Sequence, residues 1–226
     1  KSMGSPRTAS VAAVSYKAKN YSLVVAIKYY EHIEKLNNCV SDAEAVIQLL
    51  TEDFEFEREE VCFICSGPLK PAFEDVTVLA PRDDGTIAPA KATRSVVLRE
   101  LRRVAKLIEK DQEEDPKLKV NLLLYYSGHG WYDDFLDQGY WIPVDSELDD
   151  YSKYISNGTI QDFLNGIPTH HTLLLSDSCF SGSLFATGTG KSLASTRLEK
   201  DPSRWGITAG RNEVVSDGEA GEQSPF

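Results

Sequence analysis

Residues 120–126, VNLLLYY, decide the fold, because they give the strongest strand prediction in the chain. A continuous apolar run of this length is typical of a strand that is buried on both faces of a parallel sheet. Other runs of the same character are residues 21–27 (YSLVVAI), 61–65 (VCFIC) and 172–176 (TLLLS). Together these runs predict a sheet whose strands are covered on both sides.

Three helices are predicted between the strands. The first follows a capping-box pattern at residues 41–44 (SDAE), with apolar side chains at helical spacing behind it. The second starts after Thr93. Its apolar face consists of Val97, Leu101, Val104, Ala105 and Ile108. The third is short, is capped by Ser156 or Asn157 and ends at Gly166.

The alternation of strand and helix predicts an α/β fold with a doubly wound, mostly parallel sheet. Residues 67–92 are rich in Pro, Asp and Gly and indicate a long insertion, with a short strand expected at residues 76–80. Residues 205–209 are expected to form the last strand. We divide the chain into an N-terminal extension (1–20), a main part (21–186), a linker or processing loop (187–204) and a C-terminal part (205–226).

The composition argues against several classes of protein. The chain has 226 residues, of which 41% are hydrophobic and 26% charged, the balance of a globular domain. No apolar run approaches the roughly 18 residues that span a membrane. The formal net charge of −11 argues against nucleic acid, because a phosphate backbone is bound by clustered Lys and Arg. An acidic surface attracts cationic partners instead.

The cysteines point to a reducing compartment. There are four of them, and the first twenty residues lack the apolar core of a signal peptide, so we expect no disulfide framework and a cytoplasmic location. Cys62 and Cys65 form a C-x-x-C pattern, but no second pair or spaced histidine completes a zinc site. Because they lie in an apolar run, core packing is the favoured interpretation, and no metal ligands are predicted.

Two motifs follow directly after strands, where chemistry collects in parallel α/β sheets. Residues 125–130, YYSGHG, supply His129, and residues 176–182, SDSCFSG, supply Cys179. Consecutive strands usually lie side by side, so we expect both side chains to meet at one edge of the sheet. A thiolate beside an imidazole suffices for acyl transfer, and backbone N–H groups of the glycine-rich turns can stabilise the tetrahedral intermediate. Each residue alone is more typical of an ordinary structural role.

The two motifs together resemble those of the caspase and metacaspase class of cysteine peptidases, and most closely the prokaryotic, metacaspase-like branch. The likeness extends over about residues 21–226 and leaves residues 67–92 outside. It implies a caspase-like three-layer αβα sandwich around a mostly parallel sheet. It also implies that His129 is the general base and acid and Cys179 the nucleophile, with an oxyanion hole formed by the backbone N–H groups of Gly130 and Cys179.

Asp177, two residues before Cys179, bears on the choice of substrate. Metacaspase-like enzymes carry an acid here and cut after Arg or Lys, and a partly desolvated carboxylate favours a cationic side chain. Further acids of the substrate pocket are expected at Asp42 and at Glu213 or Asp217. The alternative for Asp42 is an interaction with a helix N-terminus. The alternative for Glu213 and Asp217 is that they are solvated loop charges. Self-processing is expected in the linker, at one of the basic residues Lys191, Arg197, Lys200 and Arg204.

The region between the two motifs is crowded with aspartates and aromatic residues. The aspartates are Asp133, Asp134, Asp137, Asp145, Asp149 and Asp150. The chemistry requires no cofactor, but some metacaspases need calcium, so a calcium site and a solvated acidic loop both stay open. Trp131, Tyr132, Tyr140 and Trp141 either wall a substrate cleft or pack against the sheet.

The expected partners are protein or peptide substrates with basic cleavage sites, and an upstream activator or partner domain. Neither nucleic acid nor a membrane is expected. The alternative to a peptidase is a catalytically silent caspase-like module with an interaction or regulatory role. The presence of both catalytic residue types, His129 and Cys179, argues against that alternative.

Overall fold

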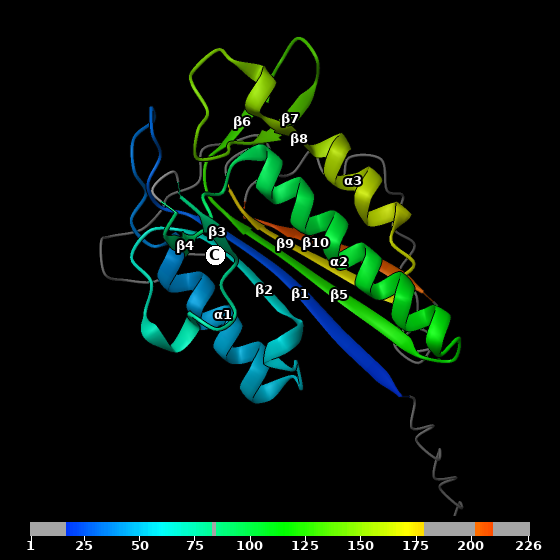
Figure 1. The fold of residues 1–226 in the computed structure, drawn as a ribbon. Coiled ribbons are helices and arrows are strands. Elements are labelled where there is room, and N and C mark those ends of the chain that lie inside the picture. Colours follow the sequence, from blue (N-terminus) through cyan, green and yellow to red (C-terminus); the bar gives the residue numbers. More distant parts are fainter. Residues whose placement is uncertain (1–16, 83–84, 179–201, 210–226) are drawn as a thin grey trace, which may run out of the picture.

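The structure, a computed structural model, describes residues 17–82, 85–178 and 202–209. Its centre is a five-stranded sheet with the strand order β10-β9-β5-β1-β2 (Figure 1). The strands are β1 (Ala18–Ile27), β2 (Val61–Ser66), β5 (Lys119–Ser127), β9 (His171–Asp177) and β10 (Ser203–Thr208). All four pairings are parallel, and β5 lies in the middle, which confirms the predicted parallel α/β sheet.

Helices cover both faces of this sheet. Helices α2 (Arg94–Glu114) and α3 (Asn157–Gly166) lie on one face, and α1 (Cys39–Asp53) lies on the other (Figure 1). Thr93 caps α2 through its side chain, at the predicted start of that helix. Ser156, one of the two predicted candidates, caps α3 in the same way. The arrangement is the expected three-layer αβα sandwich. Within the described residues, no helix has the length and apolar character needed to cross a bilayer.

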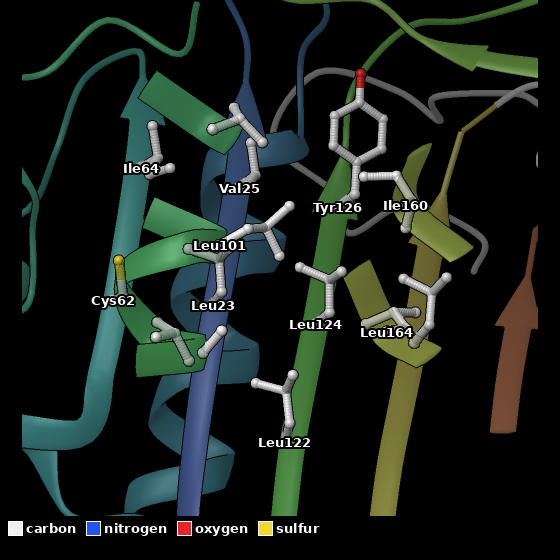
Figure 2. Close-up of a cluster of buried hydrophobic side chains, with 14 of the residues drawn as sticks. Leu23, Val25, Cys62, Ile64, Leu101, Leu122, Leu124, Tyr126, Ile160 and Leu164 are labelled. Atoms are coloured by element: carbon white, nitrogen blue, oxygen red, sulfur yellow. The ribbon is translucent and has the colours of Figure 1, made fainter. Parts of the chain in front are cut away.

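The core between the sheet and α2 and α3 joins two of these layers. Figure 2 shows Leu23 and Leu124 of the sheet on the side that faces Leu101 of α2 and Leu164 of α3. Each of these side chains is buried. Because burying one leucine stabilises a fold by roughly 1.5–3 kcal/mol, this contact fixes the helices against the sheet.

The first helix begins before the capping box that the sequence suggests. It starts at Cys39, and no side chain caps its N-terminus. The hydroxyl of Ser41 donates to the carbonyl of Asn38 at 2.7 Å. The buried carboxylate of Glu44 accepts from the ammonium of Lys70 at 2.6 Å and from its backbone N–H at 3.1 Å. The capping-box prediction was wrong because a partner distant in sequence binds Glu44.

The insertion at residues 67–92 is more ordered than expected. It contains the antiparallel strands β3 (Leu79–Pro81) and β4 (Ile87–Pro89) and the 3-10 helix η2 (Pro71–Phe73); another 3-10 helix, η1 (Arg58–Glu60), precedes β2. The strand expected at residues 76–80 overlaps β3 at Leu79 and Ala80 only, and before it Thr77 forms an isolated bridge to Phe63 of β2. Proline in both β3 and β4 removes backbone donors, which is consistent with such short strands.

A second, antiparallel sheet lies beyond the carboxyl ends of the main strands (Figure 1). It consists of β6 (Gly130–Asp133), β7 (Gln138–Trp141) and β8 (Ile155–Ser156), with the 3-10 helix η3 (Tyr151–Lys153) before β8. Trp141 is 1% exposed and stacks on Tyr126 of β5, with ring centroids 4.2 Å apart and planes 2° apart. Trp141 therefore packs against the main sheet and fixes the small sheet to it.

Cys62 and Cys65 are buried free thiols on opposite faces of β2, which confirms the predicted core role. Burial raises the pKa of the Cys62 thiol to about 11 and that of the Cys65 thiol to about 12. Both side chains are therefore neutral at physiological pH and pack as small apolar groups.

Replacing Leu124 by Ala tests the importance of this core. We expect the free energy of unfolding to fall by about 2–5 kcal/mol, because the substitution leaves a cavity between β5 and the helices. Urea denaturation measures the change. Leu49→Ala is the control: this side chain of α1 is 49% exposed, so its loss should change stability by about 0.5 kcal/mol or less. Equal losses for both variants would contradict the assignment of the core.

Candidate active site

The two sequence motifs end strands that are neighbours in the sheet. In the register of β5 against β9, Ser127 lies opposite Asp177. The N–H of Gly128 also donates to the carbonyl of Asp177 at 3.4 Å. The chain therefore leaves the sheet at the same edge in both motifs, two residues before His129 and two before Cys179. This confirms the predicted neighbourhood of the two strands.

Tyrosine hydroxyls hold the backbone of His129 from both sides. Its N–H donates to the hydroxyl oxygen of Tyr30 at 2.7 Å, and its carbonyl accepts from the hydroxyl of Tyr126 at 2.7 Å. The same carbonyl accepts from the N–H of Ile142 at 3.1 Å. Burial raises the pKa of Tyr30 well above its ordinary value, so its hydroxyl stays neutral at physiological pH. The His129 peptide is thus fixed between the segment after β1 and the segment after β7.

The imidazole ring is oriented from the segment after β1. Its Nε2 lies 2.8 Å from the carbonyl oxygen of Glu34, and its centroid lies 4.8 Å from that of the Tyr30 ring. A carbonyl oxygen only accepts hydrogen bonds, so this contact requires the proton on Nε2. In the neutral ring, Nδ1 is then the nitrogen that can accept a proton. A backbone carbonyl here orients the ring, a role that a carboxylate has in Ser-His-Asp triads.

Gly128 makes the approach of the two tyrosines to this turn sterically possible. A Cβ atom at this position would lie 2.8 Å from the hydroxyl oxygen of Tyr30 and 2.8 Å from that of Tyr126. Real Cβ contacts are essentially never that short. Any larger residue would therefore push away the hydroxyls that bind His129.

Two of the acids predicted to bind substrate lie near the same buried tyrosine. Tyr125 of β5 is buried among residues of the α1 side. Burial first, and then the charges of Asp177 and Asp42, raise its pKa. Asp42 lies in the first turn of α1 and is itself buried, while Asp177 ends β9 on the same face of the sheet as Ser127. Asp42 and Asp177 therefore both lie near enough to Tyr125 to act on it electrostatically. The first-turn position also suits the helix N-terminus interpretation of Asp42.

Several predicted residues lie outside the described residues: Cys179, Glu213, Asp217, Lys191, Arg197 and Lys200. Gly130 is described and begins β6 opposite Trp141 of β7. Arg204 is described too and lies in β10, which begins at Ser203, two residues before the start expected for the last strand. Its guanidinium donates to the carbonyls of Leu164, Ile167 and Thr169, which gives it a structural role.

The aspartates after the histidine motif stabilise turns. The carboxylate of Asp133 accepts from the N–H groups of Phe135 and Leu136, and that of Asp150 accepts from the N–H of Ser152. In the part of the chain that the structure describes, no three His, Cys, Asp or Glu side chains gather in a way that could hold a metal ion. The contacts of Asp133 and Asp150 thus give these two aspartates a role in the local turns.

Tyr30 and Glu34, which hold His129, were not predicted from the sequence. Both lie in the segment that directly follows β1, a neighbour of β5 in the sheet. The rule that functional groups follow strand ends, applied to β1 as well, would have identified this segment.

Gly128→Ala tests the packing around His129. We expect it to lower the free energy of unfolding by about 1–3 kcal/mol, because the new methyl group displaces the two tyrosine hydroxyls. Gly166→Ala is the control, since a Cβ there meets no atom within 4 Å. Thermal and urea denaturation of both variants measure the effect, and a neutral Gly128→Ala would contradict the close approach.

The geometry agrees with a comparison with known protein families. The family model of the caspase domain, peptidase C14, matches residues 19–221, a range that includes both motifs and all five strands of the main sheet except the first residue of β1. No curated protein gives a significant match. Since the family model covers most of the sequence, the chain belongs to the caspase domain family of cysteine peptidases.

Proposed function

We propose that the protein is a cysteine endopeptidase that cleaves peptide bonds after Arg or Lys. The observation that carries the proposal is the parallel pairing of β5 with β9, which brings the turn of His129 beside the end of the strand that precedes Cys179. Membership of the caspase domain family supports the same reaction class. The hydrogen bond from Nε2 to Glu34 supports His129 as the base, because it leaves Nδ1 to accept a proton.

In the proposed reaction, Nδ1 of His129 takes the proton of the Cys179 thiol, and the thiolate attacks the carbonyl carbon of the scissile bond. Backbone N–H groups of Gly130 and Cys179 stabilise the resulting oxyanion. The intermediate collapses as the imidazolium gives its proton to the leaving amine, and a thioester remains. Water then loses a proton to His129 and attacks the thioester, which releases the acid product and returns the proton to the sulfur.

Specificity for Arg or Lys rests on Asp42 and Asp177. Both carboxylates act on the buried Tyr125, at the edge of the sheet where β5 and β9 end. Two acids in a partly desolvated place favour a cationic side chain, and a guanidinium can bind them through several hydrogen bonds. Glu213 or Asp217 would add a further acid. The expected partners are therefore polypeptides with basic cleavage sites.

Cleavage of a peptide library tests the reaction and its specificity together. The wild-type chain should cut after Arg or Lys, while Cys179→Ala and His129→Ala should each lose at least about 10³-fold in kcat/KM. Asp177→Asn should reduce cleavage after Arg by about a hundredfold, because a charged partner is lost from the pocket. Assays with EDTA and with added calcium measure whether the ion is required.

Asp162→Asn provides the matched control, because this exposed acid of α3 lies on the face of the sheet opposite α1. Its kcat/KM should equal that of the wild type. Cleavage only after Asp would contradict the role of Asp42 and Asp177. An inactive wild-type chain whose Cys179 resists active-site labelling would favour the silent interaction module.

Self-processing is a separate prediction for the linker at residues 187–204. Active protein should produce two fragments on storage, cut after Lys191, Arg197 or Lys200, whereas Cys179→Ala should stay intact. Arg204 should not be cut, because it lies in β10 and its guanidinium is bound to the carbonyls of Leu164 and Thr169. Mass spectrometry identifies the new termini, and identical fragments from both proteins would refute self-processing.

A further inference from the structure

The turn between β6 and β7 presents two adjacent apolar side chains to solvent. Phe135 is 94% exposed and Leu136 is 58% exposed. Single exposed apolar residues are common, but neighbouring ones on a projecting hairpin are typical of interaction sites. Figure 1 shows this hairpin in the small sheet beyond the carboxyl ends of the main strands.

Local hydrogen bonds, not packing, hold the turn in this shape. The carboxylate of Asp133 accepts from the N–H of Phe135 at 2.9 Å and from that of Leu136 at 3.0 Å. The hydroxyl of Tyr132 donates to the carboxylate of Asp137, whose φ of 51° is left-handed. The conformation that turns both apolar side chains outward is therefore ordered before any partner binds, which lowers the entropy cost of binding.

The charge around the turn indicates which partner fits. Residues 130–154 contain seven acids and one lysine. That residue, Lys153, forms an ion pair with Glu147 and donates to the carbonyl of Asp145. The surplus of negative charge disfavours anionic lipid and nucleic acid and favours a polypeptide that carries Lys or Arg beside apolar side chains.

The position of the hairpin relates it to the candidate active site. Strand β6 begins at Gly130, directly after His129, and its four residues span roughly 13 Å. A polypeptide cleaved beside His129 can therefore reach the turn with a few extended residues. At the base of the hairpin, the indole N–H of Trp131 donates to the hydroxyl of Tyr151 at 3.2 Å.

We propose that Phe135 and Leu136 form a docking site for a substrate segment outside the cleaved bond, one that carries basic and apolar side chains. The proposal rests on the proposed peptidase function, because the occupant is the polypeptide to be cut. Binding of a peptide to this turn does not depend on cleavage, so the docking site and the peptidase function can fail separately.

Binding is measured on the Cys179→Ala chain by fluorescence anisotropy, with a fluorescein-labelled peptide of Gly, Ser, Lys and Leu as the probe. Two matched peptides replace Leu by Ser or Lys by Glu. The double substitution F135S/L136S should weaken binding of the Lys and Leu probe about tenfold, because two apolar contacts are lost. Both matched peptides should bind more weakly than the probe.

L79S/I87S is the control variant, because Leu79 and Ile87 are another exposed apolar pair, 54% and 63% exposed, on the β3–β4 hairpin. Its affinity for the probe should equal that of the parent chain. Equal affinity of the parent and F135S/L136S would overturn the proposal. The proposal would also fail if the Leu-to-Ser peptide bound as tightly as the probe, since charge alone would then explain binding.

Cleavage by the chain with Cys179 intact supplies the second readout. F135S/L136S should reduce kcat/KM about tenfold for a substrate that carries the basic and apolar segment, with no change for a short substrate. No cleavage of either substrate, with probe binding retained, would refute the peptidase function and leave the binding surface. Loss of self-association in F135S/L136S, measured by light scattering, would identify the turn as an interface between copies and overturn substrate docking.

Discussion

The parallel register of β5 against β9 is the constraint on which the candidate active site depends. Side chains alternate between the two faces of a strand. A shift of one residue in the pairing of β5 with β9 would therefore move all side chains of one face of the strand to the other face. In the observed register, Tyr125, Ser127 and Asp177 lie on the face that α1 covers, together with Asp42. In the same register β5 and β9 end at the same level, so both sequence motifs begin at the same edge of the sheet. Chemistry at that edge therefore rests on ordinary backbone hydrogen bonds between two buried strands.

Around His129 the fold uses neutral groups to position an ionisable one. The hydroxyls of Tyr30 and Tyr126 bind the backbone N–H and the backbone carbonyl of His129, and the carbonyl of Glu34 binds its imidazole ring. Neutral hydrogen bonds of this kind fix a tautomer without placing a charge beside the imidazole. The stacking of Trp141 on Tyr126 extends the support to the small sheet, so the ring position depends on contacts from three segments of the chain.

Much of the fold could be predicted from the sequence, because its strands are short apolar runs and its helices have regular apolar faces. The start of α1 could not be predicted, because Glu44 forms an ion pair with Lys70. The sequence around the helix start contains no information about that pair. The short strands of the small sheet carry no clear period of two. Tyr30 and Glu34 were missed for a related reason: they lie 99 and 95 residues from His129 in sequence. That the two motifs are neighbours could be predicted because each follows the end of a strand. The roles of His129, Asp42 and Asp177 follow from the family resemblance and stay predictions.

The buried thiols of β2 have a consequence for the protein's reactivity toward electrophiles. An alkylating reagent attacks the thiolate, and burial keeps Cys62 and Cys65 protonated far above neutral pH. Under oxidising conditions the same two sulfurs face opposite sides of a strand, so they cannot form a bond with each other without unfolding β2. In the native chain these two sulfurs are therefore protected from covalent modification.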